Sequence, residues 1–194
     1  MTMKEGINMA TLMFKYGAMG AAKTAEALIC KYRYEERTGN KVLLLKTKDA
    51  IRDGECMIKS RIEGLTSEAG ILEEFLNRDR TNIMVDASNY NLIIVDEIQF
   101  ASRKSIDLLA EIVDTIGTNI CCYGLKTDYH GELFEGSKRL LEIADSIREI
   151  ETICKCGKKA IMNIKVSDPG NNDKTAKYIS LCRKCSNDFI TVLS

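Results

Sequence analysis

Residues 11–37 read TLMFKYGAMGAAKTAEALICKYRYEER, and this stretch decides the fold. It opens with the apolar run Thr11–Phe14, which is typical of a buried strand. A glycine-containing turn follows, and Lys23–Arg37 has the pattern of a helix that ends at Gly39. A strand, a glycine loop and a helix in this order place backbone N–H groups at a helix start, where they can bind phosphate.

The loop between the strand and the helix matches the pattern G-x-x-x-x-G-K-[ST] except at the second glycine, which is Ala22 here. The expected phosphate-binding residues are Gly17, Ala18, Met19, Gly20, Ala21, Ala22, Lys23 and Thr24. In such a loop Lys23 carries positive charge to the β- and γ-phosphates of ATP, and Thr24 ligates Mg²⁺. The β-carbon of Ala22 either crowds the phosphates or strains the turn, unless the residue adopts a helix-like φ that alanine tolerates. The other interpretation is a helix start with small residues and a solvated lysine.

The remaining chain alternates short apolar runs with amphipathic ones. Further strands are expected at Val42–Leu45, Leu92–Val95 and Asn119–Tyr123, and further helices at Ser67–Leu76, Ser102–Ile116 and Glu132–Ala144, with a loop at Lys46–Gly64. Fully apolar strands separated by helices predict an α/β fold whose parallel sheet is covered on both faces. Ligands bind beyond the carboxyl ends of such strands, so segments 15–24, 46–61, 96–100 and 124–134 are expected at the site.

An acidic pair, Asp96-Glu97, follows the third apolar run directly. In P-loop proteins a carboxylate at this place helps to hold Mg²⁺. The next one projects to the other side and can accept a proton from a hydroxyl or a water. The alternative is a pair of solvated turn acids, which is less expected downstream of a phosphate loop.

Four cysteines near the end of the chain have the spacing of metal ligands. Cys154-x-Cys156 and Cys182-x-x-Cys185 form two close pairs in polar, loop-like sequence. Four thiolates around Zn²⁺ leave no open position, so this zinc is expected to be structural and to organise a small zinc-ribbon-like domain at 151–194, after a larger domain at 1–150. The alternative is four unrelated thiols. Most of Cys30, Cys56, Cys121 and Cys122 are expected to be core thiols, with Cys56 the exception.

Charge and composition limit the classes of partner. The 194 residues carry 28 basic and 28 acidic side chains, so the net charge is zero, with eight basic and four acidic residues in 151–194. This balance disfavours a protein that coats nucleic acid or a membrane surface. No apolar run approaches the 18 residues of a membrane span, and the N-terminus lacks a signal-peptide pattern. We therefore expect a cytoplasmic protein with reduced thiols and with neither nucleic acid nor a membrane as partner.

Five segments together resemble the type II thymidine kinases, the small zinc-containing family. They are YGAMGAAKT (16–24), VDEIQF (95–100), YGLKTDYHGELFEGSKRLLEIADSI (123–147), ETICKCGKKA (151–160) and YISLCRKC (178–185). The resemblance implies a RecA-like α/β domain, followed by a small zinc domain whose lasso loop closes over the nucleoside. It further implies a homotetramer inhibited by the triphosphate end product, and transfer of the γ-phosphoryl of ATP to the 5′-hydroxyl of thymidine.

The same resemblance assigns roles residue by residue. Glu97 corresponds to the base that accepts the 5′-hydroxyl proton, Asp96 and Thr24 to the Mg²⁺ site, and Lys23 and Arg52 to the phosphate-binding residues. The residues that it places at the nucleoside are Gln99, Phe100, Tyr129, Phe134 and Tyr178. Gln99 and Phe100 belong to the same signature as Glu97 and are expected to support the active site. Ordinary packing is the alternative role of the aromatic side chains at 129, 134 and 178, and the sole histidine, His130, is expected at the surface without a role.

Three departures from the family pattern suggest an altered activity. Ala22 replaces a glycine, and the D-x-R pattern after the second strand is Ala50-Ile51-Arg52, with Asp49 one place earlier. The lasso interval Ile161–Lys177 is short and lacks the family's apolar strand, and its Asp168–Asn171 stretch is typical of a hairpin turn. Backbone hydrogen bonds to the base contribute strongly to discrimination, so we expect relaxed nucleoside specificity or reduced activity.

Three functions follow from the sequence. The first is an ATP-dependent deoxynucleoside kinase, most simply for thymidine. The second is a nucleotide-binding homologue with relaxed specificity or little catalysis. The third, a zinc-ribbon nucleic-acid protein with a motor-like ATPase domain, is disfavoured by the zero net charge and by the lack of a basic-aromatic stripe.

Overall fold

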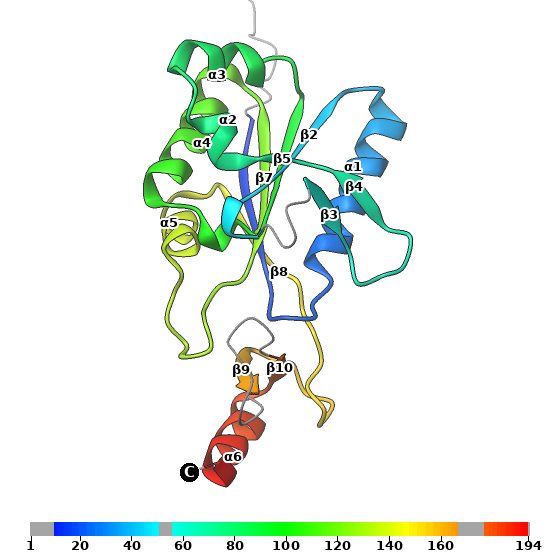
Figure 1. Ribbon diagram of the computed structural model, residues 1–194, viewed down its shortest axis with the longest axis vertical. Helices are drawn as coiled ribbons and strands as arrows, with labels where there is room; N and C mark the ends of the chain where they lie inside the picture. Colours follow the sequence, from blue (N-terminus) through cyan, green and yellow to red (C-terminus); the bar gives the residue numbers. More distant parts are fainter. Residues whose placement is uncertain (1–9, 51–55, 167–176, 194) are drawn as a thin grey trace, which may run out of the picture.

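The computed structural model describes residues 10–50, 56–166 and 177–193, which are built around a six-stranded sheet (Figure 1). The strands are β1 (Leu12–Tyr16), β2 (Val42–Lys46), β5 (Gly70–Ile71), β6 (Leu92–Asp96), β7 (Asn119–Gly124) and β8 (Ser146–Glu149). They lie in the order β5-β2-β6-β7-β1-β8, and every neighbouring pair in this sheet is parallel. The predicted α/β class and parallel sheet are confirmed, and the RecA-like fold that the resemblance implies is present.

Helices cover both faces of the sheet (Figure 1). They are α1 (Lys23–Thr38), α2 (Leu72–Leu76), α3 (Arg80–Ala87), α4 (Arg103–Ile116) and α5 (Glu135–Ile143), with 3₁₀ turns η1 (Lys48–Ala50) and η2 (Ile98–Phe100). The predicted start of α4 is confirmed, because the Ser102 side chain accepts a hydrogen bond from the backbone N–H of Ser105. Both α1 and α4 end at a glycine in the left-handed region, Gly39 and Gly117.

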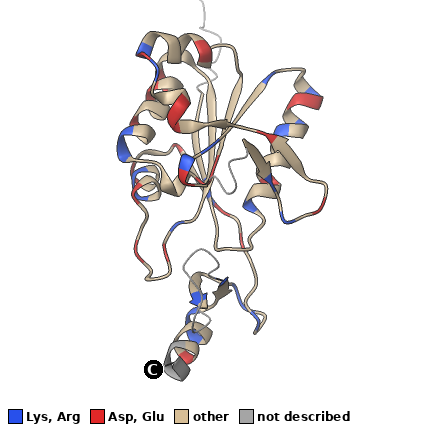
Figure 2. Cartoon of the chain, in the orientation of Figure 1, with Lys and Arg blue, Asp and Glu red and all other residues tan. Residues whose placement is uncertain are grey.

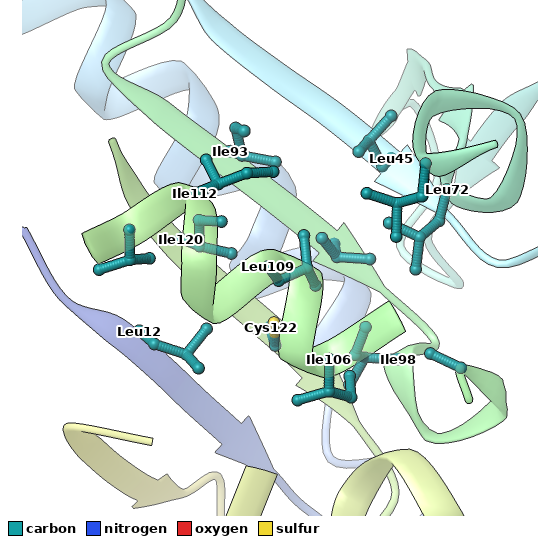
Figure 3. Close-up of a cluster of buried hydrophobic side chains, with 14 of the residues drawn as sticks. Leu12, Leu45, Leu72, Ile93, Ile98, Ile106, Leu109, Ile112, Ile120 and Cys122 are labelled. Carbon is teal, nitrogen blue, oxygen red and sulfur yellow. The ribbon is translucent and has the colours of Figure 1, made fainter. Parts of the chain in front are cut away.

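Strand β6 is apolar throughout because both of its faces are buried. Ile93 and Val95 belong to the cluster beneath α4, whereas Leu92 and Ile94 belong to the cluster beneath α1. Figure 3 shows the first cluster, with side chains of α4 packed onto the strands. Burying a side chain of this size contributes about 1.5–3 kcal/mol. These two clusters fix the sheet, and with it the edge at which its carboxyl ends meet.

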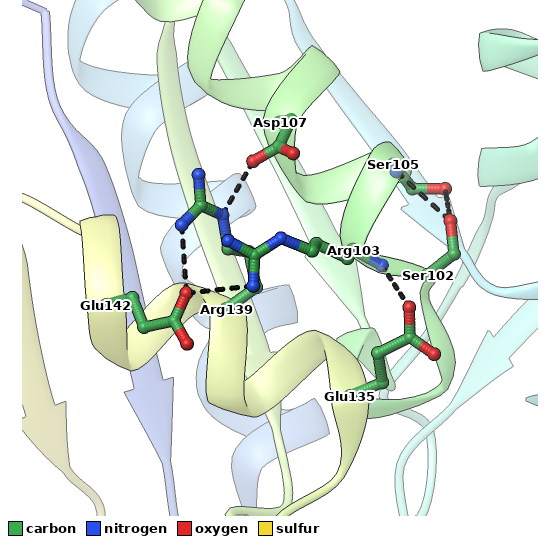
Figure 4. Close-up of polar contacts among 7 residues, drawn as sticks. All are labelled: Ser102, Arg103, Ser105, Asp107, Glu135, Arg139 and Glu142. Carbon is green, nitrogen blue, oxygen red and sulfur yellow. Dashed lines mark hydrogen bonds and ion pairs between the residues drawn. The ribbon is translucent and has the colours of Figure 1, made fainter.

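Polar contacts join α5 to α4 at the surface (Figure 4). Arg139 bonds Asp107 at 2.6 Å and Glu142 at 2.9 Å, and Arg103 bonds Glu142 at 3.2 Å. Exposed ion pairs of this kind contribute only about 0–1 kcal/mol each. They orient α5, whose Gly136 lies so close to η2 that a Cβ there would be 2.5 Å from the Ile98 carbonyl oxygen.

The prediction of a helix over Ser67–Leu76 is wrong for its first half. Thr66–Glu68 forms β4, which pairs with β3 (Met57–Lys59) in an antiparallel hairpin, and only Leu72–Leu76 is helical. β5 pairs with β2, and a Cβ on Gly70 would be 2.9 Å from the side chain of Leu45. Ile58 of the hairpin belongs to the same apolar cluster as Leu44 of β2. Tertiary packing therefore overrides a weak helical pattern here. The segment expected as a loop at 46–64 holds η1 and β3, and neither α3 nor β8 was predicted.

After β8 the chain forms a small unit (Figure 1). Strands β9 (Met162–Val166) and β10 (Lys177–Leu181) are antiparallel, and α6 (Arg183–Leu193) follows them. The cluster consists of Cys154, Ala160, Ile164, Leu181 and Cys182. Lys and Arg prevail over Asp and Glu in this unit (Figure 2). The strands expected of a short hairpin are present, while the predicted turn at 168–171 lies outside the described residues.

Across the described ranges, helices are either too short or too polar to serve as a membrane span.

Candidate active site

The loop Gly17–Thr24 joins the carboxyl end of β1 to α1, as the sequence predicted. Gly17 is required by close packing, because a Cβ there would lie 2.4 Å from the carbonyl oxygen of Ile150. Gly20 is required by conformation, since its φ of +78° lies in the left-handed region. The two glycines thus hold the loop against the sheet and turn it toward the helix.

Ala22 also adopts a left-handed conformation, with φ 56° and ψ 28°. Of the two expectations for this position, the strained turn is correct and the helix-like φ is wrong. Its carbonyl oxygen still accepts the first helical hydrogen bond of α1, from the Glu26 N–H at 2.9 Å. The backbone of the glycine loop is therefore preserved, and alanine occupies a conformation that costs a residue with a Cβ roughly 1 kcal/mol more than glycine.

Lys23 is buried at the end of the loop. Its Nζ donates hydrogen bonds to the carbonyl oxygens of Gly17 and Ala18, both at 3.0 Å. Burial lowers the pKa of Lys23, the charges of Glu97 and Asp96 act in the opposite direction, and Arg61 lowers the pKa further. The lysine is thus the local positive charge that faces the acidic pair.

Arg61 was not singled out from the sequence, although the segment 46–61 was expected at the site. It lies at the turn between β3 and β4, and its charge acts on Lys23 across the site. A basic residue just after a strand, in a segment expected at the carboxyl edge, is the signal that could have found it.

The two predicted Mg²⁺ ligands contact each other. The Thr24 side chain forms a hydrogen bond with Asp96, which is 3% exposed at the end of β6. Burial, followed by the charge of Glu97, raises the pKa of Asp96 to about 6, against the stabilising hydrogen bonds from Thr24 and from the Glu97 N–H. A hydroxyl and a buried carboxylate beside a phosphate loop are the donor set that Mg²⁺ takes in P-loop proteins, so these residues fit the ion.

Three hydrogen bonds fix the position of Glu97. Its carboxylate oxygen Oε2 accepts a hydrogen bond from Gln99 Nε2 at 2.6 Å, and its carbonyl oxygen accepts one from Thr47 at 3.2 Å. Its own N–H donates to Asp96 Oδ1 at 3.0 Å. Its φ of 54° is a second left-handed conformation outside glycine, which such contacts must hold in place. A half-buried carboxylate fixed in this way suits proton transfer.

Gln99 lies behind Glu97, with both ends of its amide in use. It is 2% exposed, and its Oε1 accepts a hydrogen bond from the Leu125 N–H at 3.0 Å, at the end of β7. Gly124 allows this approach, because a Cβ there would be 2.6 Å from Gln99 Oε1. The structure thus shows Gln99 bonded to both the Glu97 carboxylate and the backbone at the end of β7.

The four predicted aromatic residues form two pairs. The rings of Phe100 and Phe134 meet edge to face with centroids 5.6 Å apart, and those of Tyr129 and Tyr178 lie 6.3 Å apart. Phe100 and Tyr129 expose 42% and 41% of their surface, which leaves ring area available to a ligand. His130, which was expected at the surface without a role, packs on Tyr129 with ring centroids 4.0 Å apart.

The structure brings the four predicted metal ligands together at one point. The Sγ atoms of Cys154, Cys156, Cys182 and Cys185 all lie within 4.8 Å of one another. The Sγ atoms of Cys156 and Cys182 are 3.6 Å apart, close to the roughly 3.8 Å that follows from tetrahedral Zn–S bonds of about 2.3 Å. Backbone N–H groups lower the pKa of the Cys154 thiol to about 6, which favours the thiolate. The donor set fits a closed four-thiolate zinc site.

The other predicted positions are placed as follows. Arg52 lies outside the described residues, and Asp49 is exposed in η1. Cys121 and Cys122 are buried, Cys30 is half-buried and Cys56 is exposed, so the expectation for the remaining thiols is confirmed.

A parallel sheet with a phosphate loop after β1, an acidic pair after β6 and a four-cysteine cluster defines an α/β protein of the P-loop class. The sequence model of the thymidine kinase family matches residues 10–186. The thymidine kinase of Enterobacteria phage T4 is 40% identical over 190 residues, which cover 93% of this chain and 97% of the phage protein. That of Francisella tularensis is 40% identical over 196 residues (91% and 96%), and that of Vibrio cholerae 38% over 188 (91% and 96%). The chain belongs to the thymidine kinase family.

The strained alanine gives a first prediction. Ala22→Gly is expected to raise the free energy of unfolding by about 1 kcal/mol, because glycine adopts the left-handed region without a steric cost. Urea unfolding followed by circular dichroism measures the change. Ala21→Gly is the matched control, since Ala21 is buried and has no positive φ, and it should destabilise the protein. Equal effects of the two substitutions would contradict strain at position 22.

The raised pKa of Asp96 gives a second prediction. The folded state favours the neutral acid, so this contribution to stability is present below about pH 4 and is lost as the pH rises through about 6. Asp96→Asn keeps the acceptor oxygen and removes the buried charge. Its unfolding free energy relative to the parent should therefore increase by about 1–3 kcal/mol between pH 4 and pH 7.5.

Unfolding curves of both proteins over that pH range provide the measurement. Asp114→Asn, on the exposed face of α4, removes the same charge without burial and serves as the control. A stability difference that stays constant with pH for Asp96→Asn would show that the ionised carboxylate carries no burial penalty.

Proposed function

We propose that the protein is an ATP-dependent thymidine kinase that transfers the γ-phosphoryl group of ATP to the 5′-hydroxyl of thymidine, in the salvage of DNA precursors. The observation that carries this proposal is the Glu97 carboxylate, fixed by Gln99 at 2.6 Å beside the buried Asp96–Thr24 pair. The thymidine kinase family match over 10–186 supports the choice of substrate class.

Phosphoryl transfer requires positioning and the stabilisation of charge more than covalent help from the protein. We assign the phosphates of ATP to the loop Gly17–Thr24, with Arg52 and Lys23 as the cationic residues. Thr24 and Asp96 would hold Mg²⁺, which supplies positive charge to the β- and γ-phosphate oxygens when it is bound. ATP binding requires the Lys23 ammonium to turn from the loop carbonyls that it now bonds toward phosphate.

Glu97 is the proposed base. Its Oε2 is bonded by Gln99, so the proton of the 5′-hydroxyl goes to Oε1. As that proton leaves, the bond from the 5′-oxygen to the γ-phosphorus forms and the bond to the β–γ bridging oxygen breaks, with ADP as leaving group.

The nucleoside would lie against the exposed rings of the two aromatic pairs. Gln99, Phe100, Tyr129, Phe134 and Tyr178 are the residues assigned to this side of the site. Tyr129 lies on a tight loop whose Asp128 side chain accepts hydrogen bonds from the N–H groups of His130 and Glu132, at 2.8 and 2.9 Å. These hydrogen bonds fix the loop that carries the Tyr129 ring.

We also propose that the four-cysteine cluster holds structural Zn²⁺ and that residues 1–150 and 151–194 are separate domains. The tight sulfur cluster and the separate apolar cluster of the smaller unit support this division. The same resemblance to type II thymidine kinases supports a homotetramer in the cytoplasm, where thiols stay reduced.

The function is tested by incubating the protein with ATP, Mg²⁺ and each of thymidine, deoxyuridine, deoxycytidine and deoxyguanosine. Phosphorylation of thymidine is the expected result. Turnover of thymidine alone would remove the alternative of relaxed specificity, whereas comparable turnover of several nucleosides would support it. Nucleotide binding without any turnover would overturn the kinase proposal.

Glu97→Gln separates catalysis from binding. It should lower kcat by about 10²–10⁴-fold, the usual contribution of a general base, and keep the dissociation constant of ATP within about two-fold. Glutamine retains an oxygen that can accept from Gln99, so the site geometry persists. Glu36→Gln, on the exposed face of α1, is the matched control and should leave both quantities unchanged. Retained turnover in Glu97→Gln would exclude the proposed base.

Metal analysis tests the zinc site. The purified protein should contain one zinc per chain, and Cys182→Ser should lose it together with the stability of the C-terminal unit, because metal binding supplies folding free energy there. Cys56→Ser removes an exposed thiol outside the cluster and should keep the zinc. Full zinc content in Cys182→Ser would contradict the four-thiolate assignment.

A further inference from the structure

Two side chains of the C-terminal hairpin hold one peptide of the phosphate loop. Asn163 Oδ1 accepts a hydrogen bond from the Met19 N–H at 2.8 Å, and the Ser180 hydroxyl donates one to the Met19 carbonyl oxygen at 2.5 Å. Both contacts span more than a hundred residues of sequence. They are made by side chains rather than by a strand ladder, so their loss need not disturb the sheet or the hairpin.

The two side chains form a directly opposed pair on neighbouring strands. Asn163 on β9 faces Ser180 on β10 in the antiparallel register, and their side-chain oxygens are 3.4 Å apart. Asn163 is 4% exposed, and its Nδ2 donates to the carbonyl oxygen of Thr127 at 3.3 Å. A single buried amide thus joins the hairpin to both the phosphate loop and the loop that carries Tyr129.

The cysteine cluster fixes the hairpin end that carries this pair. Cys182 directly follows the last residue of β10, and the Leu181 carbonyl oxygen accepts from the Ile161 N–H at 2.9 Å. Ala160, just before β9, donates through its N–H to the Thr152 carbonyl oxygen at 2.8 Å. The β9–β10 ladder therefore sets the register of Asn163 and Ser180, and the cysteine cluster adjoins the end of that ladder.

Met19 lies in the phosphate loop between the residues that bond Lys23 and a glycine with a positive φ. The two carbonyl groups that bond Lys23 belong to Gly17 and Ala18, the two residues just before it. Gly20 follows it, with φ +78°. Hydrogen bonds to the Met19 peptide fix the direction of the backbone next to this glycine, and phosphate binding depends on the direction of the loop's N–H groups.

We propose that Asn163 and Ser180 are positioning residues for the phosphate loop, through which the four-cysteine unit holds the Met19 peptide in its nucleotide-binding conformation. The proposal deepens the proposed kinase function and rests on it for the identity of the nucleotide. It predicts that two side chains of the hairpin, remote in sequence from the phosphate loop, affect ATP affinity through their hydrogen bonds to Met19.

The test uses the full-length zinc-loaded protein, three variants and a control. Ser180→Ala removes the bond to the Met19 carbonyl oxygen, and Ser180→Thr keeps the hydroxyl donor. Asn163→Ala removes the bond from the Met19 N–H together with the bond to Thr127. Lys177→Ala, on the exposed start of β10, is the control. Zinc content is measured for each protein, so that a change in the loop is separated from loss of the metal.

Hydrogen exchange at the Met19 amide tests the bond to Asn163 directly. In Asn163→Ala the Met19 amide should exchange at least ten-fold faster, whereas the Glu26 amide, bonded to the Ala22 carbonyl oxygen, should stay protected. The dissociation constant of ATP measured by calorimetry should rise about five- to twenty-fold in both alanine variants, in line with the loss of one buried hydrogen bond. Ser180→Thr should recover most of the affinity, and Lys177→Ala should match the parent.

Unchanged Met19 exchange and unchanged ATP affinity in the zinc-loaded alanine variants would overturn the proposal. So would equal losses of ATP affinity in Ser180→Ala and Ser180→Thr, because those would reflect packing rather than the hydrogen bond. Neither hydrogen exchange nor calorimetry requires the protein to turn over a nucleoside. If ATP affinity depends on the bonds to Met19 but no nucleoside is phosphorylated, the proposed function is contradicted and the role of Asn163 and Ser180 is still supported.

Discussion

Burial of strand β6 on both faces is the constraint on which the rest of the structure depends. Leu92 and Ile94 pack beneath α1, and Ile93 and Val95 pack beneath α4, so the strand can lie only at the centre of a parallel sheet. Its carboxyl end then emerges beside those of its neighbours, and Asp96 is carried to the edge where the phosphate loop begins. The site is a consequence of how this strand is covered.

This placement has an energetic cost that is concentrated at the site. Asp96 is buried next to Glu97, which raises its pKa to about 6, and both Ala22 and Glu97 adopt left-handed backbone conformations. Strain and buried charge persist only where the surrounding structure holds them. Here the supports are the Asp96–Thr24 contact, the Gln99 amide and the close glycine packing at Gly17 and Gly124. The apolar core thus stabilises a polar edge that would not be stable alone.

The structure shows what two of the departures from the family pattern do. Ala22 preserves the glycine backbone and adds strain, so it changes stability more than loop shape. The short lasso interval still begins and ends in strands β9 and β10, which hold the Met19 peptide of the phosphate loop. The C-terminal unit therefore contributes to the nucleotide side of the site, whereas sequence reasoning connected it with the nucleoside.

The sequence by itself determined the α/β class, the phosphate loop, the acidic pair and the four-cysteine cluster, because each rests on a local pattern: an apolar run, a glycine spacing or a cysteine spacing. It predicted a helix over Ser67–Leu76, of which only Leu72–Leu76 is helical, since short polar strands such as β4 are stabilised by their partners rather than by their own residues. Only the tertiary structure decided the φ of Ala22, the placement of Gln99 behind Glu97, and the bonds from Asn163 and Ser180 to Met19. These depend on contacts between residues far apart in the chain, whose energies no local pattern encodes.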